Sequence, residues 1–165
     1  GNSGHLLRTA YGAEIDAHYV VMRINQAPTH SYEKHVGRRT THRLLNRLWT
    51  LAYQDYKGLS GMYRRFAKRW PLEKGVTLIS SRTNSDNFVS LAEYLAKTWR
   101  RRDVTALVMN RALVSRAEAM IKDFRHCVER KLRRKFAGGN TASSGMVAVV
   151  ILRELCHEVR GCRTS

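Results

Sequence analysis

Short runs rich in β-branched residues alternate with longer stretches of helical periodicity, and this alternation constrains the fold of the chain more than any other feature. Three runs have strand composition: residues 18–24 (HYVVMRI), 76–80 (VTLIS) and 104–109 (VTALVM), the last of which we expect to be buried. Apolar spacing predicts four helices, over residues 42–57, 88–100, 113–136 and 145–158. Strands that alternate with helices favour an α/β domain with a mostly parallel central sheet flanked by helices.

Turn and capping residues set the expected ends of these elements. Pro28 biases Ala27 away from helix, so the first strand should run into a loop. Thr40 or Thr41 could cap the helix of residues 42–57, and residues 58–75 are expected to be irregular and basic. Ser143 or Ser144 is the expected cap of the last helix.

The chain is strongly basic. It has 165 residues with 30 Lys and Arg against 13 Asp and Glu, a formal net charge of +17. Such a charge favours a polyanionic partner, which could be nucleic acid, an anionic membrane surface or a phosphorylated ligand, or it makes a basic solvated surface. No stretch reaches the roughly 18 apolar residues of a membrane span. No helix-turn-helix, RNP or zinc-finger pattern supports a nucleic-acid-binding module, which remains an alternative carried by the charge alone.

The cysteines give no sign of a metal site. Cys127, Cys156 and Cys162 are odd in number and form no CxxC pair, which argues against structural zinc.

Two Gly/Ser-rich stretches have the chemistry of anion-binding loops. Gly1-Asn2-Ser3-Gly4 offers backbone N–H groups, an amide and a hydroxyl, and Ser143-Ser144-Gly145 stands at the start of a predicted helix. The alternative for each is an ordinary turn or helix cap. Neither is a Walker loop, because no GK[ST] follows.

The longer pattern around the first loop is more specific. GNSG, YGAEIDAH (11–18), VMRINQAPT (21–29) and YEKHVGRRTTHRL (32–44) together resemble the long sialylmotif of the eukaryotic sialyltransferases. TASSGMVAVVILRELCHEV (141–159) resembles their short sialylmotif. The resemblance implies that residues 1–165 are part of a sialyltransferase catalytic domain, with the long motif at 1–44 and the short motif at 141–159.

The resemblance also implies a fold and an activity. The fold is a Rossmann-like nucleotide-sugar transferase (GT-A-like) fold, here incomplete at both ends. The family transfers sialic acid from CMP-sialic acid to a glycoprotein or glycolipid glycan, with inversion and without metal or other cofactor. Family members are type II membrane proteins with a lumenal domain in the Golgi, and no nucleic-acid partner is expected. A transferase that uses another CMP-activated acid sugar is an alternative within the same chemistry.

Seven residues match donor-binding positions of the family, and Asn46 does so only in the α2,6-linking branch. They are Asn2, Ser3, Asn25, Asn46, Ser143, Ser144 and Gly145. Asn amides can donate to phosphate oxygens and read a cytosine edge, and a helix N-terminus suits a phosphate or carboxylate. The alternatives are that Asn25 caps its own turn and that Asn46 sits on a helix face.

The resemblance assigns no catalytic residue in this chain. His42, His126 and His157 match no catalytic His of the family, whose position would follow Ser165, so the chain as given is expected to transfer no sugar. Asp16 and His18 are expected to hold a loop. Cys156 matches the short-motif cysteine, whose disulfide partner would precede Gly1, and we expect Cys156 to be buried and unpaired.

Overall fold

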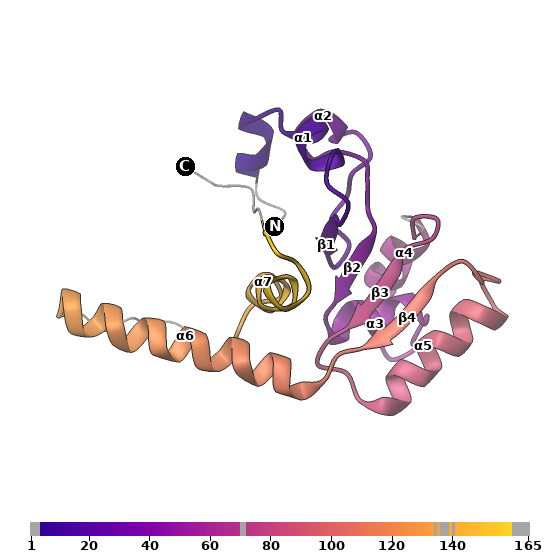
Figure 1. The fold of residues 1–165 in the computed structure, drawn as a ribbon. Coiled ribbons are helices and arrows are strands. Elements are labelled where there is room, and N and C mark those ends of the chain that lie inside the picture. The colour runs from indigo at the N-terminus through magenta and orange to yellow at the C-terminus, as the bar shows by residue number, and fades with distance from the viewer. Residues whose placement is uncertain (1–3, 70–71, 134, 136–138, 140, 160–165) are drawn as a thin grey trace. The chain divides into compact units, whose positions relative to one another are not determined.

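The computed structural model describes residues 4–69, 72–133, 135, 139 and 141–159 (Figure 1). The chain divides into two compact units. The first contains residues up to Met109 and includes all four described strands, and the described residues of the second, which begins at Asn110, contain two helices. In the described part of the chain no helix is both long enough and apolar enough to cross a membrane.

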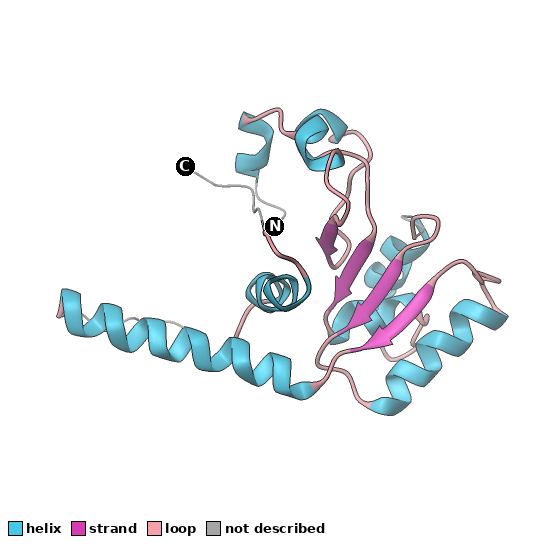
Figure 2. Ribbon diagram, viewed as in Figure 1, coloured by secondary structure: helices cyan, strands magenta, loops and turns pink. Residues whose placement is uncertain are grey.

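The first unit is built on a four-stranded sheet with strand order β1-β2-β3-β4 (Figure 2). The strands are β1 (Met22–Ile24), β2 (His42–Leu45), β3 (Thr77–Ser80) and β4 (Thr105–Val108). All three pairings are parallel, with Met22 opposite His42, His42 opposite Thr77, and Thr77 opposite Thr105. The predicted α/β fold with a parallel sheet is confirmed, as are strands within 18–24, 76–80 and 104–109.

Helices cover one face of this sheet. The helices of the first unit are η1 (Gly4–Arg8), α1 (Gly12–Asp16), α2 (Glu33–Val36), α3 (Arg47–Tyr53), α4 (Gly61–Arg69) and α5 (Ser85–Lys97). Leu45 of β2 and Leu78 of β3 lie in one core cluster with residues of α3, α4 and α5. Connections between neighbouring parallel strands are right-handed as a rule, which explains why α3, α4 and α5 lie on the same face.

The helix predicted over residues 42–57 is wrong in its first part. Residues 42–45 form β2, and the helix begins only at Arg47, with Asn46 as its N-cap. Thr41 does not cap it; the Thr41 hydroxyl instead accepts a hydrogen bond from the Val21 N–H at 2.8 Å and so joins β2 to β1. Leu44 and Leu45 are both fully buried. Consecutive leucines suit a strand buried on both faces as well as they suit a helix. Because residues 48–52 have helical periodicity, the strand and the helix that follows it are predicted from the sequence as a single helix.

Two further predictions are wrong. Residues 61–69, expected to be irregular, form the amphipathic helix α4, which places Ala67 in the core. The strand at 104–109, expected to be buried, is largely exposed at Leu107 and Val108. Among the strands that the structure describes, β4 pairs only with β3, so one of its edges has no neighbour.

The second unit consists of α6 (Arg111–Leu132) and α7 (Ser144–Leu155), which pack against each other. These helices confirm the predictions over 113–136 and 145–158. The Arg116 guanidinium pairs with the Glu154 carboxylate at 2.7 Å between the two helices. The N-cap of α7 is Ser143, which is one of the two residues expected to cap this helix.

Candidate functional site

Asparagines follow two neighbouring strands of the sheet at the point where each strand ends. Asn25 comes directly after β1 and Asn46 directly after β2. Because the carboxyl ends of parallel strands meet at one edge, these residues lie together, where α/β sheets bind their ligands. The two amides predicted as donor-binding residues are therefore neighbours in the fold.

The side-chain oxygen of each asparagine accepts a hydrogen bond from a backbone N–H group. The Asn25 Oδ1 accepts a hydrogen bond from the Asn46 backbone N–H at 2.9 Å. The Asn46 Oδ1 accepts from the Trp49 N–H at 3.0 Å and caps α3. Since both oxygens are engaged by N–H donors, the orientation of each amide is fixed. Both amide NH₂ groups are left without a partner among the described residues, and each can donate two hydrogen bonds to a ligand.

The backbone at Asn25 takes a conformation that few residue types tolerate. Its φ is +53°, in the left-handed region where Asn is among the residues best accommodated. Its N–H donates to the Leu44 carbonyl at 2.7 Å. The expectation that Asn25 caps its own turn is not what the structure shows, because its side chain reaches across to the next strand.

A buried arginine holds the turn that carries Asn25. Arg43 of β2 is only 3% exposed, and its Nη1 donates to the Asn25 carbonyl oxygen at 2.6 Å and to the Ala27 carbonyl at 3.5 Å. Its Nε and Nη2 donate to the Glu73 carboxylate. Burial raises the pKa of Glu73, but hydrogen bonds, chiefly from Arg43, together with the charge of Arg43 hold this pKa below its ordinary value. The sequence analysis predicts neither residue, because it places Arg43 in a helix and Glu73, 30 residues away, in an irregular segment.

The segment that leads into β2 is also fixed by polar contacts. The Asp16 carboxylate accepts hydrogen bonds from the N–H groups of Arg38 at 3.0 Å and Arg39 at 2.8 Å. The Arg23 guanidinium donates to the carbonyl oxygens of Val36 at 2.8 Å and Arg39 at 2.8 Å. Asp16 thus has a structural role, as expected, although the segment that it holds is the one before β2 and not the loop after the first helix.

The Ser143-Ser144-Gly145 stretch lies in the second unit, at the N-terminus of α7. The Ser143 hydroxyl accepts from the Met146 N–H at 3.2 Å, which leaves the N–H groups of Ser144 and Gly145 unpartnered among the described residues. The first turn of α7 has no acidic residue. This helix end can therefore receive an anion, while its convergence with Asn25 and Asn46 stays a prediction.

Other predicted residues have mixed outcomes. Asn2 and Ser3 lie outside the described residues. Cys156 is free, as expected, but it is partly exposed at the C-cap of α7, so the prediction that it is buried is wrong. Among the histidines, His42 contacts the Thr41 hydroxyl at 2.9 Å, and burial lowers its pKa.

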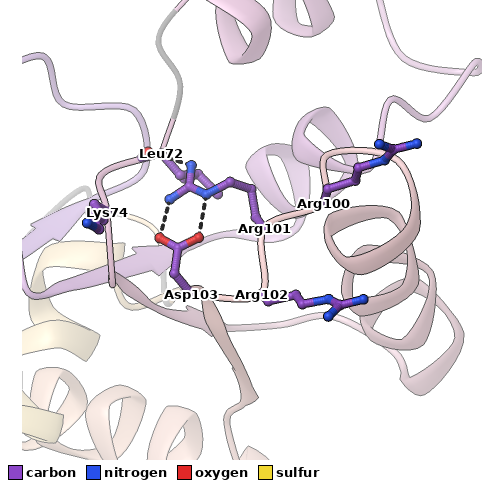
Figure 3. Close-up of a pocket in the computed structure, with 6 residues that line it drawn as sticks. All are labelled: Leu72, Lys74, Arg100, Arg101, Arg102 and Asp103. Carbon is purple, nitrogen blue, oxygen red and sulfur yellow. Dashed lines mark hydrogen bonds and ion pairs between the residues drawn. The ribbon is translucent and has the colours of Figure 1, made fainter.

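A pocket of about 500 Å³ lies elsewhere in the first unit. It is lined by residues that precede β3 and β4, among them Lys74 and Asp103 (Figure 3). It is therefore at the amino ends of these strands, whereas Asn25 and Asn46 lie at carboxyl ends. This pocket is therefore separate from the two asparagines.

The comparison with protein families gives one match across the chain. The family model described as glycosyltransferase family 29 (sialyltransferase) matches residues 1–161. Curated relatives match over a shorter stretch. The mouse CMP-N-acetylneuraminate-beta-galactosamide-alpha-2,3-sialyltransferase 2 is 56% identical over 45 residues, which are 27% of this chain and 13% of that protein. The sialyltransferase-like protein 2 of Arabidopsis thaliana is 53% identical over 47 residues, 28% of this chain and 11% of that protein.

Relatives of both linkage types match over a similar length. The beta-galactoside alpha-2,6-sialyltransferase 2 of Xenopus tropicalis is 51% identical over 45 residues, 27% of this chain and 9% of that protein. The match therefore does not select the α2,6 branch that Asn46 suggested.

The fold is also similar to a solved structure. A mammalian sialyltransferase superposes with a TM-score of 0.56 at 23% identity, over 94% of this chain and 49% of that one. The same comparison with a mammalian sialyltransferase in complex with Gal-beta-1-3GalNAc-ortho-nitrophenol gives 0.53 at 22% identity, over 94% of this chain and 50% of that one. The chain thus spans about half the length of these structures, and its fold is that of the sialyltransferases.

Proposed function

The chain belongs to glycosyltransferase family 29, the sialyltransferases, and from this premise we propose that it forms the donor-binding part of a sialyltransferase. The whole enzyme transfers sialic acid from CMP-sialic acid to a glycan acceptor. The acceptor hydroxyl forms a bond to the anomeric carbon, CMP leaves from its opposite side, and a base takes the hydroxyl proton. We assign donor binding to this chain and leave the base unassigned.

The observation that carries the proposal is the pair of NH₂ groups on Asn25 and Asn46. Both amides present only donors toward a ligand, because their oxygens are used within the protein. Phosphate oxygens accept such hydrogen bonds without donating any in return. A nucleoside monophosphate ester is therefore a better fit at these strand ends than a ligand that needs acceptors.

We also assign roles to the other residues that match donor-binding positions of the family. The unpartnered N–H groups at Ser144 and Gly145, with the helix dipole, suit the second negative group of the donor, its carboxylate. Asn2 and Ser3 would supply further hydrogen bonds to the nucleotide. In the longer protein we propose a Golgi lumenal location and a glycoprotein or glycolipid acceptor.

The test is a calorimetric titration with CMP and then with CMP-sialic acid. The double variant Asn25→Asp/Asn46→Ser keeps an oxygen acceptor at both positions but removes both NH₂ groups. We expect its affinity for CMP to fall by about a hundredfold or more, since each of the two lost hydrogen bonds to a charged group is worth roughly 1.5–3 kcal/mol. The matched control is Asn84→Ser, at the N-cap of α5, where the Asn84 Oδ1 also accepts from the N–H three residues on.

The outcomes separate the alternatives. Equal loss of CMP affinity in the control would show that the two asparagines act through helix stability rather than through the ligand. If CMP linked to a different acid sugar binds more tightly than CMP-sialic acid, the donor is that other sugar nucleotide and the proposed binding residues are retained. Absence of CMP binding with retained fold would remove the proposal.

A further inference from the structure

The excess positive charge of the chain is not explained by the donor site, and part of it gathers around a pocket at the opposite edge of the sheet. The pocket of about 500 Å³ opens before β3 and β4 and is lined by Leu72, Lys74, Arg100, Arg101, Arg102 and Asp103 (Figure 3). Four of these six side chains are basic and one is acidic. All of them belong to the first unit.

The acidic residue contributes little negative charge to this surface, because it is used to clamp the two loops together. The Arg101 guanidinium donates to both oxygens of the Asp103 carboxylate, at 2.7 and 2.9 Å. The Gly75 N–H donates to the same carboxylate at 2.8 Å. The hydrogen bonds from Arg101 and Gly75 hold the pKa of Asp103 well below its usual range.

The same guanidinium fixes the loop before β3. Arg101 Nη1 donates to the Leu72 carbonyl at 2.8 Å, and its Nη2 donates to the Glu73 carbonyl at 2.7 Å. Its neighbour Arg100 has a φ of +52°, a conformation that costs free energy at a residue with a side chain. The clamp therefore holds a strained backbone in place on the rim of the pocket.

Three cations on this rim remain available. Lys74, Arg100 and Arg102 are exposed, and within the described ranges none of them makes a hydrogen bond or ion pair. Figure 3 shows the guanidinium groups of Arg100 and Arg102 extending away from the central ion pair, with Lys74 on its other side. The free charges are thus spread along the surface and do not converge on one point.

We propose that this pocket and its rim bind an extended acidic glycan, a sugar chain that bears sulfate or carboxylate groups. A chain with several anionic groups can reach separated cations at once, which a single small anion cannot. Arg pairs with the oxygens of such groups through bidentate hydrogen bonds. Single-stranded nucleic acid is a poorer fit, because its binding surfaces combine cations with aromatic side chains, and none of the described residues that line this pocket is aromatic. The site is separate from the donor residues, and the inference stands whether or not the proposed transfer activity is correct.

The experiment measures binding of a heparin oligosaccharide to the chain at two salt concentrations. The variant Lys74→Ser/Arg100→Ser/Arg102→Ser leaves the Arg101–Asp103 clamp intact. The control variant Arg8→Ser/Lys34→Ser/Lys57→Ser removes the same charge from exposed positions outside the pocket. We expect the pocket variant to lose about tenfold or more in affinity and the control less than about threefold, with affinity falling as salt rises.

Each outcome decides the matter. Absence of heparin binding, or an equal loss in both variants, would overturn the proposal. If a mixed-sequence RNA binds as tightly as heparin and the pocket variant loses this binding too, the ligand is nucleic acid and not a glycan. If inorganic phosphate at the same total charge displaces heparin, the pocket is a simple anion site. If circular dichroism shows that the pocket variant is unfolded, the test is an NMR titration of the unaltered chain with the heparin oligosaccharide. Changes in amide chemical shift confined to residues 72–75 and 100–103 support the site, and changes elsewhere overturn it.

Discussion

The side-chain oxygen of Asn25 accepts a hydrogen bond from the backbone N–H of Asn46, so the ends of β1 and β2 are joined by a side chain. In each asparagine the side-chain oxygen accepts a hydrogen bond from the backbone, whereas the amide nitrogen has no partner among the described residues and is, in our proposal, the group that binds the ligand. The two functions can be separated by substitutions that alter one half of the amide only.

The first prediction concerns Asn46. Replacement by Ser keeps an oxygen that can cap α3, so we expect the free energy of unfolding to change by less than about 0.5 kcal/mol. Replacement by Ala removes the cap and should cost about 1 kcal/mol. Thermal unfolding of the two variants measures this difference. A Ser variant as unstable as the Ala variant would show that the amide nitrogen, too, has a structural partner.

The second prediction concerns Asn25. Aspartate tolerates the left-handed conformation and keeps the acceptor for the Asn46 N–H, so Asn25→Asp should fold with nearly unchanged stability. Asn25→Ala loses the acceptor and retains the strained φ, and we expect a loss of about 1–3 kcal/mol. Urea unfolding curves of both variants provide the comparison. Equal stability of the two variants would contradict the bridging role of the side chain.

The third prediction is a pH dependence that arises from Glu73. Its pKa is lowered in the folded protein from an ordinary value of 4.5, so its ionised form contributes stability above that value. This contribution should be lost progressively as the pH falls below about 4.5 and through the lower folded pKa. The variant Glu73→Gln should unfold more easily at pH 7 by about 1.5–3 kcal/mol, because Arg43 loses its ionic partner. Melting temperatures of both proteins between pH 3 and 7 should converge at the acid end; parallel curves would exclude this residue as the cause.

The fourth prediction concerns the packing of α1 against α2. A Cβ at Gly12 would collide with the Glu33 carbonyl oxygen and would lie 2.8 Å from that of Lys34. Because these are backbone atoms, Gly12→Ala should destabilise the protein by about 1–3 kcal/mol. Gly61→Ala is the control, since a Cβ there meets nothing within 4 Å. A Gly12 variant with the stability of the control would show that the two short helices move apart freely.

The fifth prediction concerns Tyr53, which is fully buried in the core. Its hydroxyl has no hydrogen-bond partner among the described residues, and burial raises its pKa. Removing an unsatisfied buried hydroxyl relieves its desolvation cost, so Tyr53→Phe should leave stability unchanged or raise it by about 1 kcal/mol. Calorimetric unfolding of this variant is the measurement. A clear loss of stability would mean that the hydroxyl binds an internal water molecule.

The fold class follows from the sequence because strand and helix periodicities are both present and alternate. The second strand does not, because Leu44 and Leu45 extend the helical pattern of residues 48–52 backward. Only the pairing of residues 42–45 with β1 and β3 distinguishes a strand from a helix here, and this pairing involves residues distant in the sequence. The exposed Leu107 shows a related limit, since an apolar run predicts burial whatever its neighbours are.

The candidate site divides in the same way. Asn25 and Asn46 are found from the resemblance of their motif, and their adjacency follows once each is placed after a parallel strand. The supporting ion pair is not found, because Arg43 and Glu73 are 30 residues apart and neither belongs to a recognisable pattern. Contacts of this kind are set by the packing of the sheet against its helices rather than by local sequence.

Each strand of the sheet pairs only with the strands that come immediately before and after it in the chain. Every pairing can therefore form as soon as the next strand has left the ribosome, without waiting for a distant segment to return and insert. The sheet can grow in one direction during synthesis, from β1 to β4, with each new crossover helix closing over the face already built. Until the next strand arrives, the growing edge is an open template for pairing with other chains, and the brevity of these strands limits that hazard.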